Sequence, residues 1–131
     1  MPLPRLAAAI GVAAFAVAGY SATLTPPAGS SSTVNGTAGV NGSTAWVKLT
    51  GGTAGATYPW HVHVGPCGSN GGVFGAASAY KPITISSAGN GSSKATLSMA
   101  LPDTGSYYVN IHASSSDMKT IVSCGNLAKG M

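Results

Sequence analysis

The sequence predicts an all-β domain, a β-sandwich or flattened barrel of about seven or eight strands. Glycine, serine, threonine and alanine dominate the 131 residues, and only 6% are charged, a mix too apolar for a disordered chain and too rich in glycine turns for a helical one. From Thr33 onward, apolar and polar residues alternate with a period near two, and glycine or asparagine interrupts the pattern at short intervals. Short strands at regular spacing are typical of sandwiches and small barrels, and the length fits one domain.

The N-terminal segment is apolar and marks export. An uncharged run from Leu6 to Leu24 follows Arg5. It has the features of a cleaved signal peptide, with Ala16-Val17-Ala18 as the small-residue cleavage site. It is also about long enough to span a bilayer as a helix, with Arg5 on the cytoplasmic side and small residues suited to packing on other helices. We expect residues 1–24 to form an N-terminal membrane helix, and the cleaved signal peptide is the alternative.

A short polar spacer and one folded domain are expected after this segment. Residues 25–32 are rich in proline and serine, which indicates an extended linker, and residues 33–131 would form the domain. Asn41-Gly42 and Asn90-Gly91 indicate hairpins, since a type I′ turn needs positive φ at both central residues. The expected strands are Thr33–Gly39, Ser43–Thr50, Thr57–Val64, Ile83–Ser87, Ser92–Ala100, Ser106–Ala113 and Lys119–Ser123.

The core expected between these strands is small, so a covalent link would help to stabilise it. Cys67 and Cys124 are the two cysteines of the chain, and in an exported protein two cysteines favour a disulfide. A loop of that size would contribute about 3–4 kcal/mol in the chain-entropy model. The expected core residues are Val47, Leu49, Trp60, Val62, Val64, Ala95, Leu97, Met99, Leu101, Tyr107, Val109 and Ile111.

All three histidines lie on strand-like runs, and alternation fixes their direction. His61 and His63 would share the face opposite Trp60 and Val62, and His112 would point away from the core on its own strand. Two imidazoles at positions i and i+2 can converge on one metal, and a histidine from a nearby strand completes a three-coordinate site. Imidazoles suit copper or zinc far better than calcium or magnesium. The alternative is that they are polar residues of a surface covered by a loop.

Two blocks of the sequence resemble the copper/zinc superoxide dismutases. The first is His61-Val62-His63 with Gly65 and Cys67, and the second is Asn110-Ile111-His112 followed by Cys124-Gly125. The resemblance covers about residues 33–127, and its blocks arrive in the family's order. It implies a Greek-key β-barrel, a disulfide between Cys67 and Cys124, and copper held by His61, His63 and His112.

The chain departs from the family in the parts that carry the chemistry. The family's bridging histidine should fall within Gly68 to Pro82, which contains no histidine, and Tyr80 lies near where one would be sought. The zinc-binding loop is missing, so no zinc is expected. The arginine that guides superoxide normally precedes the last cysteine by three residues, where this chain has Ile121. Copper binding is compatible with these departures, whereas fast dismutation is not.

Three functions follow as hypotheses. The first is a non-catalytic, dismutase-like extracytoplasmic (periplasmic) domain, tethered by residues 6–24 to other subunits of a larger membrane complex, for example a respiratory or photosynthetic one. The second is a secreted periplasmic copper-binding protein, released by signal cleavage. The third is a true copper-only dismutase, or a weak one. Nucleic acid is not an expected partner, because the lysines are spread out and form no basic cluster.

Overall fold

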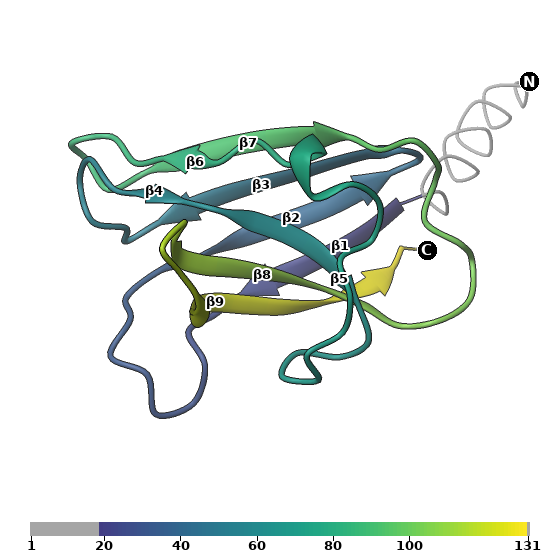
Figure 1. Ribbon diagram of the computed structural model, residues 1–131, viewed down its shortest axis with the longest axis horizontal. Coiled ribbons are helices and arrows are strands. Elements are labelled where there is room, and N and C mark those ends of the chain that lie inside the picture. The colour runs from purple at the N-terminus through teal and green to yellow at the C-terminus, as the bar shows by residue number, and fades with distance from the viewer. Residues whose placement is uncertain (1–18, 131) are drawn as a thin grey trace, which may run out of the picture.

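The structure, a computed structural model, describes residues 19–130, and this part of the chain is all-β as predicted (Figure 1). Seven strands form one curled antiparallel sheet in the order β5-β8-β9-β1-β2-β3-β7, and β4 pairs with β6 in a small second sheet. One short 3₁₀ helix, η1, precedes β6. The strands are β1 (Gly19–Leu24), β2 (Asn35–Asn41), β3 (Thr44–Thr50), β4 (Thr57–Tyr58), β5 (Trp60–Val64), β6 (Ile83–Thr84), β7 (Gly91–Thr96), β8 (Tyr107–Ser114) and β9 (Asp117–Lys129), and η1 spans Ala77–Ala79.

The curl of the large sheet gives a sandwich-like arrangement, with β1, β2 and β3 behind β5 and β8 in Figure 1. Alternate residues of each strand fill the space between the two halves, as the period of two predicts. Most of the predicted core is buried, but Val64 and Met99 are 50% and 58% exposed. Val64 is the last residue of β5, and Met99 follows the end of β7. Beyond the end of a strand, alternate side chains no longer point into the core.

Gly19–Leu24 is a strand rather than the end of a helix. β1 pairs along its full length with β2, from Gly19 opposite Asn41 to Leu24 opposite Gly36, and its start also pairs with β9. Leu24 is fully buried in the core. The expected membrane helix therefore cannot include these residues, because its apolar end packs inside the domain. Residues 1–18 of the expected helix lie outside the described residues.

The segment 25–32 is a loop within the domain and not a spacer before it. Thr25 exchanges two backbone hydrogen bonds with Cys124 of β9, at 3.1 and 2.9 Å. The Ser32 hydroxyl donates to the carbonyl of Val122 at 2.7 Å. The prolines and serines of this segment do not form a strand or a helix, which agrees with the prediction of an extended segment. Composition could not reveal that a strand precedes them. The predicted domain boundary at Thr33 was wrong, since the domain already includes Gly19.

The turns also correct the sequence reading. The hairpin at Asn41-Gly42 forms, but its central residues are Gly42 and Ser43, and only Gly42 has positive φ, at 61°. That pattern is typical of a type II′ turn and not of the expected type I′. No hairpin is centred on Asn90-Gly91, because Gly91 begins β7 and the reversal uses Gly89, with a φ of 87°.

Within residues 19–130, no helix is long and apolar enough to cross a membrane. The last strand is longer than expected, since β9 begins at Asp117 and continues to Lys129. Its second half pairs with β1 and β8, so it joins the two halves of the curled sheet.

Replacing Leu24 by alanine is expected to destabilise the domain by about 2–5 kcal/mol, because a fully buried side chain leaves a cavity in the core. Urea unfolding followed by tryptophan fluorescence measures the loss. Thr23→Ala is the matched control, since Thr23 is exposed on the same strand, and it should change the free energy of unfolding by less than about 0.5 kcal/mol. Equal stability of L24A and the parent protein would mean that β1 is not part of the folded domain.

Candidate metal centre

The pairing of β5 with β8 brings the histidines together. His61 lies opposite Asn110 and His63 opposite Tyr108, while Trp60 and Val62 face the core. Alternation therefore placed His61 and His63 correctly on the face away from the core. That face is also covered, because the two side chains are only 8% and 9% exposed. The histidines are thus neither core residues nor surface residues, but form a second, polar interior.

His112 joins them from β8 through an irregularity in the strand pairing. The register between β8 and β9 shifts on both sides of His112. Such bulges redirect side chains locally. The ring of His112 lies 5.0 Å from that of His61 and 5.9 Å from that of His63, measured between centroids. His112 is 5% exposed, so all three predicted ligands are buried in one cluster.

Backbone carbonyls fix the protonation of two of the rings. His63 donates through Nδ1 to the carbonyl of Gly71 at 2.8 Å, and His112 donates through Nδ1 to the carbonyl of Met118 at 2.8 Å. A carbonyl can only accept, so Nδ1 carries the proton and the lone pair is left on Nε2. Metal-binding histidines are commonly oriented in this way, through a hydrogen bond from the other ring nitrogen.

One nitrogen of each ring points to a common place. Because His112 carries its proton on Nδ1, its Nε2 accepts a hydrogen bond from His61 Nδ1 at 3.1 Å, whereas His63 Nε2 is buried without a hydrogen-bond partner. One ligand nitrogen from each ring lies within 4.8 Å of the others. Metal–nitrogen bonds of about 2.0–2.1 Å would set them about 3.5 Å apart in a trigonal site. The three nitrogens therefore could hold one metal ion after small movements that replace the His61–His112 hydrogen bond.

Tyr108 and Gly71 support His63 from outside the cluster. The Tyr108 ring stacks on the His63 ring, with centroids 5.0 Å apart and planes inclined by 17°. The Tyr108 hydroxyl accepts from the backbone N–H of Gly71 at 3.1 Å, and the carbonyl of that same glycine holds His63. A Cβ atom at Gly71 would lie 1.6 Å from the carbonyl oxygen of Val64, so only glycine fits this close approach.

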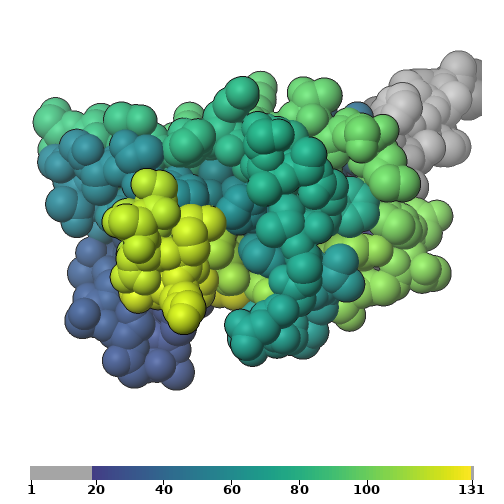
Figure 2. All heavy atoms as spheres, in the orientation of Figure 1, coloured from purple at the N-terminus to yellow at the C-terminus, as the bar shows by residue number. Residues whose placement is uncertain are grey.

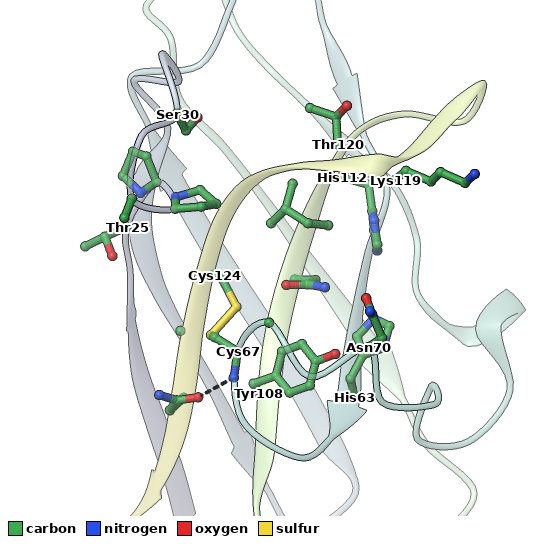
Figure 3. Close-up of a pocket in the computed structure, with 18 of the residues that line it drawn as sticks. Thr25, Ser30, His63, Cys67, Asn70, Tyr108, His112, Lys119, Thr120 and Cys124 are labelled. Carbon is green, nitrogen blue, oxygen red and sulfur yellow. Dashed lines mark hydrogen bonds between the residues drawn. A yellow bond between two sulfur atoms is a disulfide. The ribbon is translucent and has the colours of Figure 1, made fainter.

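The disulfide ties the loop that carries Gly71 to the sheet. Cys67 and Cys124 are bonded as predicted, which joins the loop after β5 to β9 (Figure 3). The backbone N–H of Cys67 also donates to the side-chain oxygen of Asn126 at 2.8 Å, drawn as a dashed line in Figure 3. The loop therefore has a covalent and a polar anchor at Cys67, a few residues before the carbonyl that orients His63.

An open groove of about 1400 Å³ leads to the cluster. Its walls are the loop between β1 and β2, the loop that carries Cys67, and the start of β9; Figure 2 shows this start, in yellow, beside the purple β1–β2 loop. His63 and His112 line the groove (Figure 3). Its lining includes Ile121 at the position where the dismutase family has its arginine, and Lys119 is its one charged residue. The groove gives access to the histidines, but its lining carries little charge that could attract an anion.

Tyr80 packs beside the cluster at the place where a bridging histidine was sought. Its ring lies edge-on to that of His61, with centroids 5.4 Å apart. The hydroxyl donates to the carbonyl of Phe74 at 2.7 Å, and burial raises the pKa of Tyr80 to about 12. Tyr80 is therefore neutral and already hydrogen-bonded, which makes it a packing partner of His61 and not a further ligand.

Burial keeps His61 and His112 neutral. Desolvation, together with the nearby His112 and His63, lowers the pKa of His61 from 6.5 to about 4. Desolvation also lowers the pKa of His112, against the opposing effect of its hydrogen bond to Met118. The neutral form of imidazole is the one that binds metals. At neutral pH these two rings are already in that form, so a metal does not have to displace the extra proton of a charged imidazolium.

The three clustered histidines and the bonded cysteines are predictable from the sequence, whereas the contacts of Tyr108, Gly71 and Met118 were not predicted. The alternation that placed His112 also puts Tyr108 on the same face of β8, so its direction could have been read from the sequence. Nothing local marks Gly71 or Met118, because they act through backbone carbonyls whose positions depend on the folded loops.

Comparison with protein-family models and with curated proteins found no match to this chain.

The metal-free domain is expected to lose stability as the pH falls from about 6.5 to 4. In this window the unfolded chain takes up a proton on His61 while the folded protein does not, so unfolding is favoured at the acid end, and above pH 6.5 the effect vanishes. The loss from His61 is on the order of 3 kcal/mol. Urea unfolding in a chelator across this range measures it.

His61→Gln is the control for this titration, because glutamine is polar but does not titrate. It should show a smaller loss across the same range. Equal stability at pH 4.5 and pH 7 in the parent protein would contradict the neutral, buried state of His61.

Proposed function

We propose that this chain is an extracytoplasmic copper-binding protein with a dismutase-like Greek-key barrel. The observation that carries the proposal is the orphaned, buried Nε2 of His63, which faces a cluster completed by His61 and His112. A buried nitrogen without a partner costs free energy, and a bound metal removes that cost. The resemblance of the two histidine blocks to the copper/zinc superoxide dismutases supports the same assignment.

The chemistry of the ligand set favours copper among the metals. The set consists of three imidazoles and, within the described residues, no carboxylate or thiolate joins them. Imidazole suits copper and zinc, and copper(II) binds more tightly than zinc at a given site of this type. A low-coordinate arrangement of three nitrogens also suits copper(I). When bound, copper would supply one-electron redox chemistry, and His63 and His112 would hold it at the floor of the groove.

Fast dismutation is not part of the proposal. The groove has Ile121 where an arginine would attract superoxide, and Tyr80 is a buried neutral phenol rather than a bridging imidazole. Electrostatic attraction raises the encounter rates of charged substrates, and a single rim lysine is a weak substitute. We propose copper storage, transfer or slow redox reactions at this site.

The disulfide supports a location outside the cytoplasm, where such bonds persist. Strand β1 bears on the alternative between a membrane tether and a cleaved signal. With Gly19–Leu24 in the sheet, thirteen residues of the apolar run, from Leu6 to Ala18, remain for a membrane helix or a signal peptide. A helix of that length is about 20 Å long, against about 30 Å of hydrocarbon, whereas it matches the apolar region of a signal peptide.

We therefore propose secretion with signal cleavage. The hypothesis of an accessory subunit in a membrane complex requires residues 6–24 to form a membrane helix. Six of these residues form β1 instead. No described residue points to a host complex, so that hypothesis stays a prediction from the sequence alone.

Copper loading tests the proposed function. The purified protein, incubated with excess copper and then dialysed, is expected to retain about one copper per chain by elemental analysis. His63→Ala and His112→Ala should each weaken binding at least 10-fold, because two imidazoles cannot complete the site. Zinc should bind more weakly in competition.

Thr120→Ala is the matched control, since Thr120 is exposed in the wall of the same groove and should leave copper affinity unchanged. Absence of retained copper in the parent protein, or equal binding by H112A, would refute the proposal. A superoxide dismutation rate close to that of the known enzymes would instead support the third hypothesis, a true copper-only dismutase.

The N-terminus of the exported protein is expected at Gly19, directly after Ala16-Val17-Ala18. This cut leaves β1 complete and removes only residues outside the described domain. Mass spectrometry of the protein isolated from the extracytoplasmic fraction checks the position. An N-terminus that still includes Leu6–Ala18 would favour the tether.

A further inference from the structure

A second surface feature lies on the outer face of β1, β2, β3 and β7, away from the histidines. Trp46 is the one aromatic residue of β3, and its neighbours Ala45 and Val47 are fully buried, so its side chain points outward. The side chain is half-buried and takes no part in the hydrophobic core. The other tryptophan, Trp60, is buried in that core.

The indole lies flat on the sheet. Gly39 of β2 is directly opposite Trp46, and a Cβ atom at Gly39 would be 2.6 Å from each of three indole atoms, Cε2, Cζ2 and Nε1. Equal distances to three ring atoms place that position under the face of the ring and not beside its edge. The absence of a side chain at Gly39 thus lets one face of the indole rest on the sheet and leaves the other face outward.

Two lysines accompany this platform. Lys94 of β7 lies directly opposite Trp46, and the ammonium of Lys48 lies over the indole ring, 5.9 Å from its centre. Together with Ser92 they line a shallow pocket of about 450 Å³ beside Trp46. The two lysines and the indole therefore form one continuous surface.

The positive charge of this surface has no acidic partner. The whole chain has two acidic residues, Asp103 and Asp117. Asp103 pairs with Lys129 at 3.2 Å, and Asp117 accepts a hydrogen bond from the backbone N–H of Thr120 at the start of β9. Neither aspartate is available to Lys48 or Lys94, so an anionic ligand would find both ammonium groups unneutralised.

The rest of the face carries hydroxyl groups. The register places Thr37 and Thr23 in one row with Lys48, and Ser21 in one row with Trp46. These side chains are exposed, and no large apolar side chain lies among them. The face therefore combines one flat aromatic ring, two cations and several exposed hydroxyl groups.

We propose that this face binds an acidic polysaccharide, with sugar rings that carry carboxylates. A sugar ring has an apolar face of C–H groups that stacks on an indole, its carboxylate pairs with Lys48 or Lys94, and its hydroxyls match Ser and Thr. Such glycans occur outside the cytoplasm, a location that the disulfide supports for this protein. The binding site is separate from the histidine cluster and does not rest on the copper proposal.

Other polyanions fit less well. Single-stranded nucleic acids are held by several aromatic side chains that stack successive bases, and this face offers one. A lipid surface would need exposed apolar side chains for insertion, which the described part of this face lacks. Both are outcomes of the test below.

The probe is an oligomer of galacturonic acid, with dextran of equal length as the neutral comparison. Titration calorimetry at 50 mM salt is expected to detect binding of the acidic oligomer and at least 10-fold weaker binding of dextran. Trp46→Ala and the double variant Lys48→Gln/Lys94→Gln should each weaken the acidic oligomer at least 10-fold. The double variant should also lose most of the salt dependence of binding.

Lys119→Gln is the matched control, because it removes one exposed cation at the histidine groove, and it should bind like the parent protein. Trp46→Phe retains an aromatic ring and should keep part of the affinity, and unfolding curves check that W46A folds. The exposed lysine variants test the proposal even if W46A does not fold.

Four results would overturn the proposal. They are no binding of the acidic oligomer at millimolar concentration, equal binding of dextran, an equal loss with Lys119→Gln, and tighter binding of polyadenylate or of anionic lipid vesicles that depends on Trp46.

Discussion

The pairing of β5 with β8 is the interaction on which the rest of the structure depends. It places Trp60 and Val62 in the hydrophobic core and, on the opposite face, His61 and His63 beside Tyr108. A shift of one residue would exchange these two faces, putting imidazoles into the core and indole into the groove. The fully buried side chains on the core side therefore set the geometry of the polar side, since their burial fixes the register.

The polar side would not be a site without the loop that follows β5. Its Gly71 carbonyl orients His63, and the Cys67–Cys124 bond anchors it to β9. β9 in turn supplies the carbonyl of Met118 that orients His112. The ligand nitrogens are thus held by backbone groups from two distant segments. This arrangement leaves the Nε2 lone pairs of His63 and His112 turned toward the cluster, which suits the binding of a metal ion.

The two proposed sites lie over different strands on the outer face of one curled sheet, and they use different chemistry. The histidine cluster is buried and reached through a wide groove, so it suits an ion that binds nitrogen. The Trp46 face is open, cationic and flat, so it suits an extended anionic ligand. A polysaccharide held at the second face would keep the copper site near a surface outside the cell, without contact between the two sites.

The sequence by itself determined the all-β class, most of the core, the three histidines that cluster and the cysteine pair. These follow from composition and from the period of two, which are local properties of the chain. It did not determine that Gly19–Leu24 is a strand, because six apolar and small residues at the end of an apolar run read equally well as helix. Pairing with β2 and the burial of Leu24 decided that. Nor could it place the carbonyls of Gly71 and Met118, or the indole of Trp46 over Gly39, because these contacts join residues that only the folded sheet and its loops bring together.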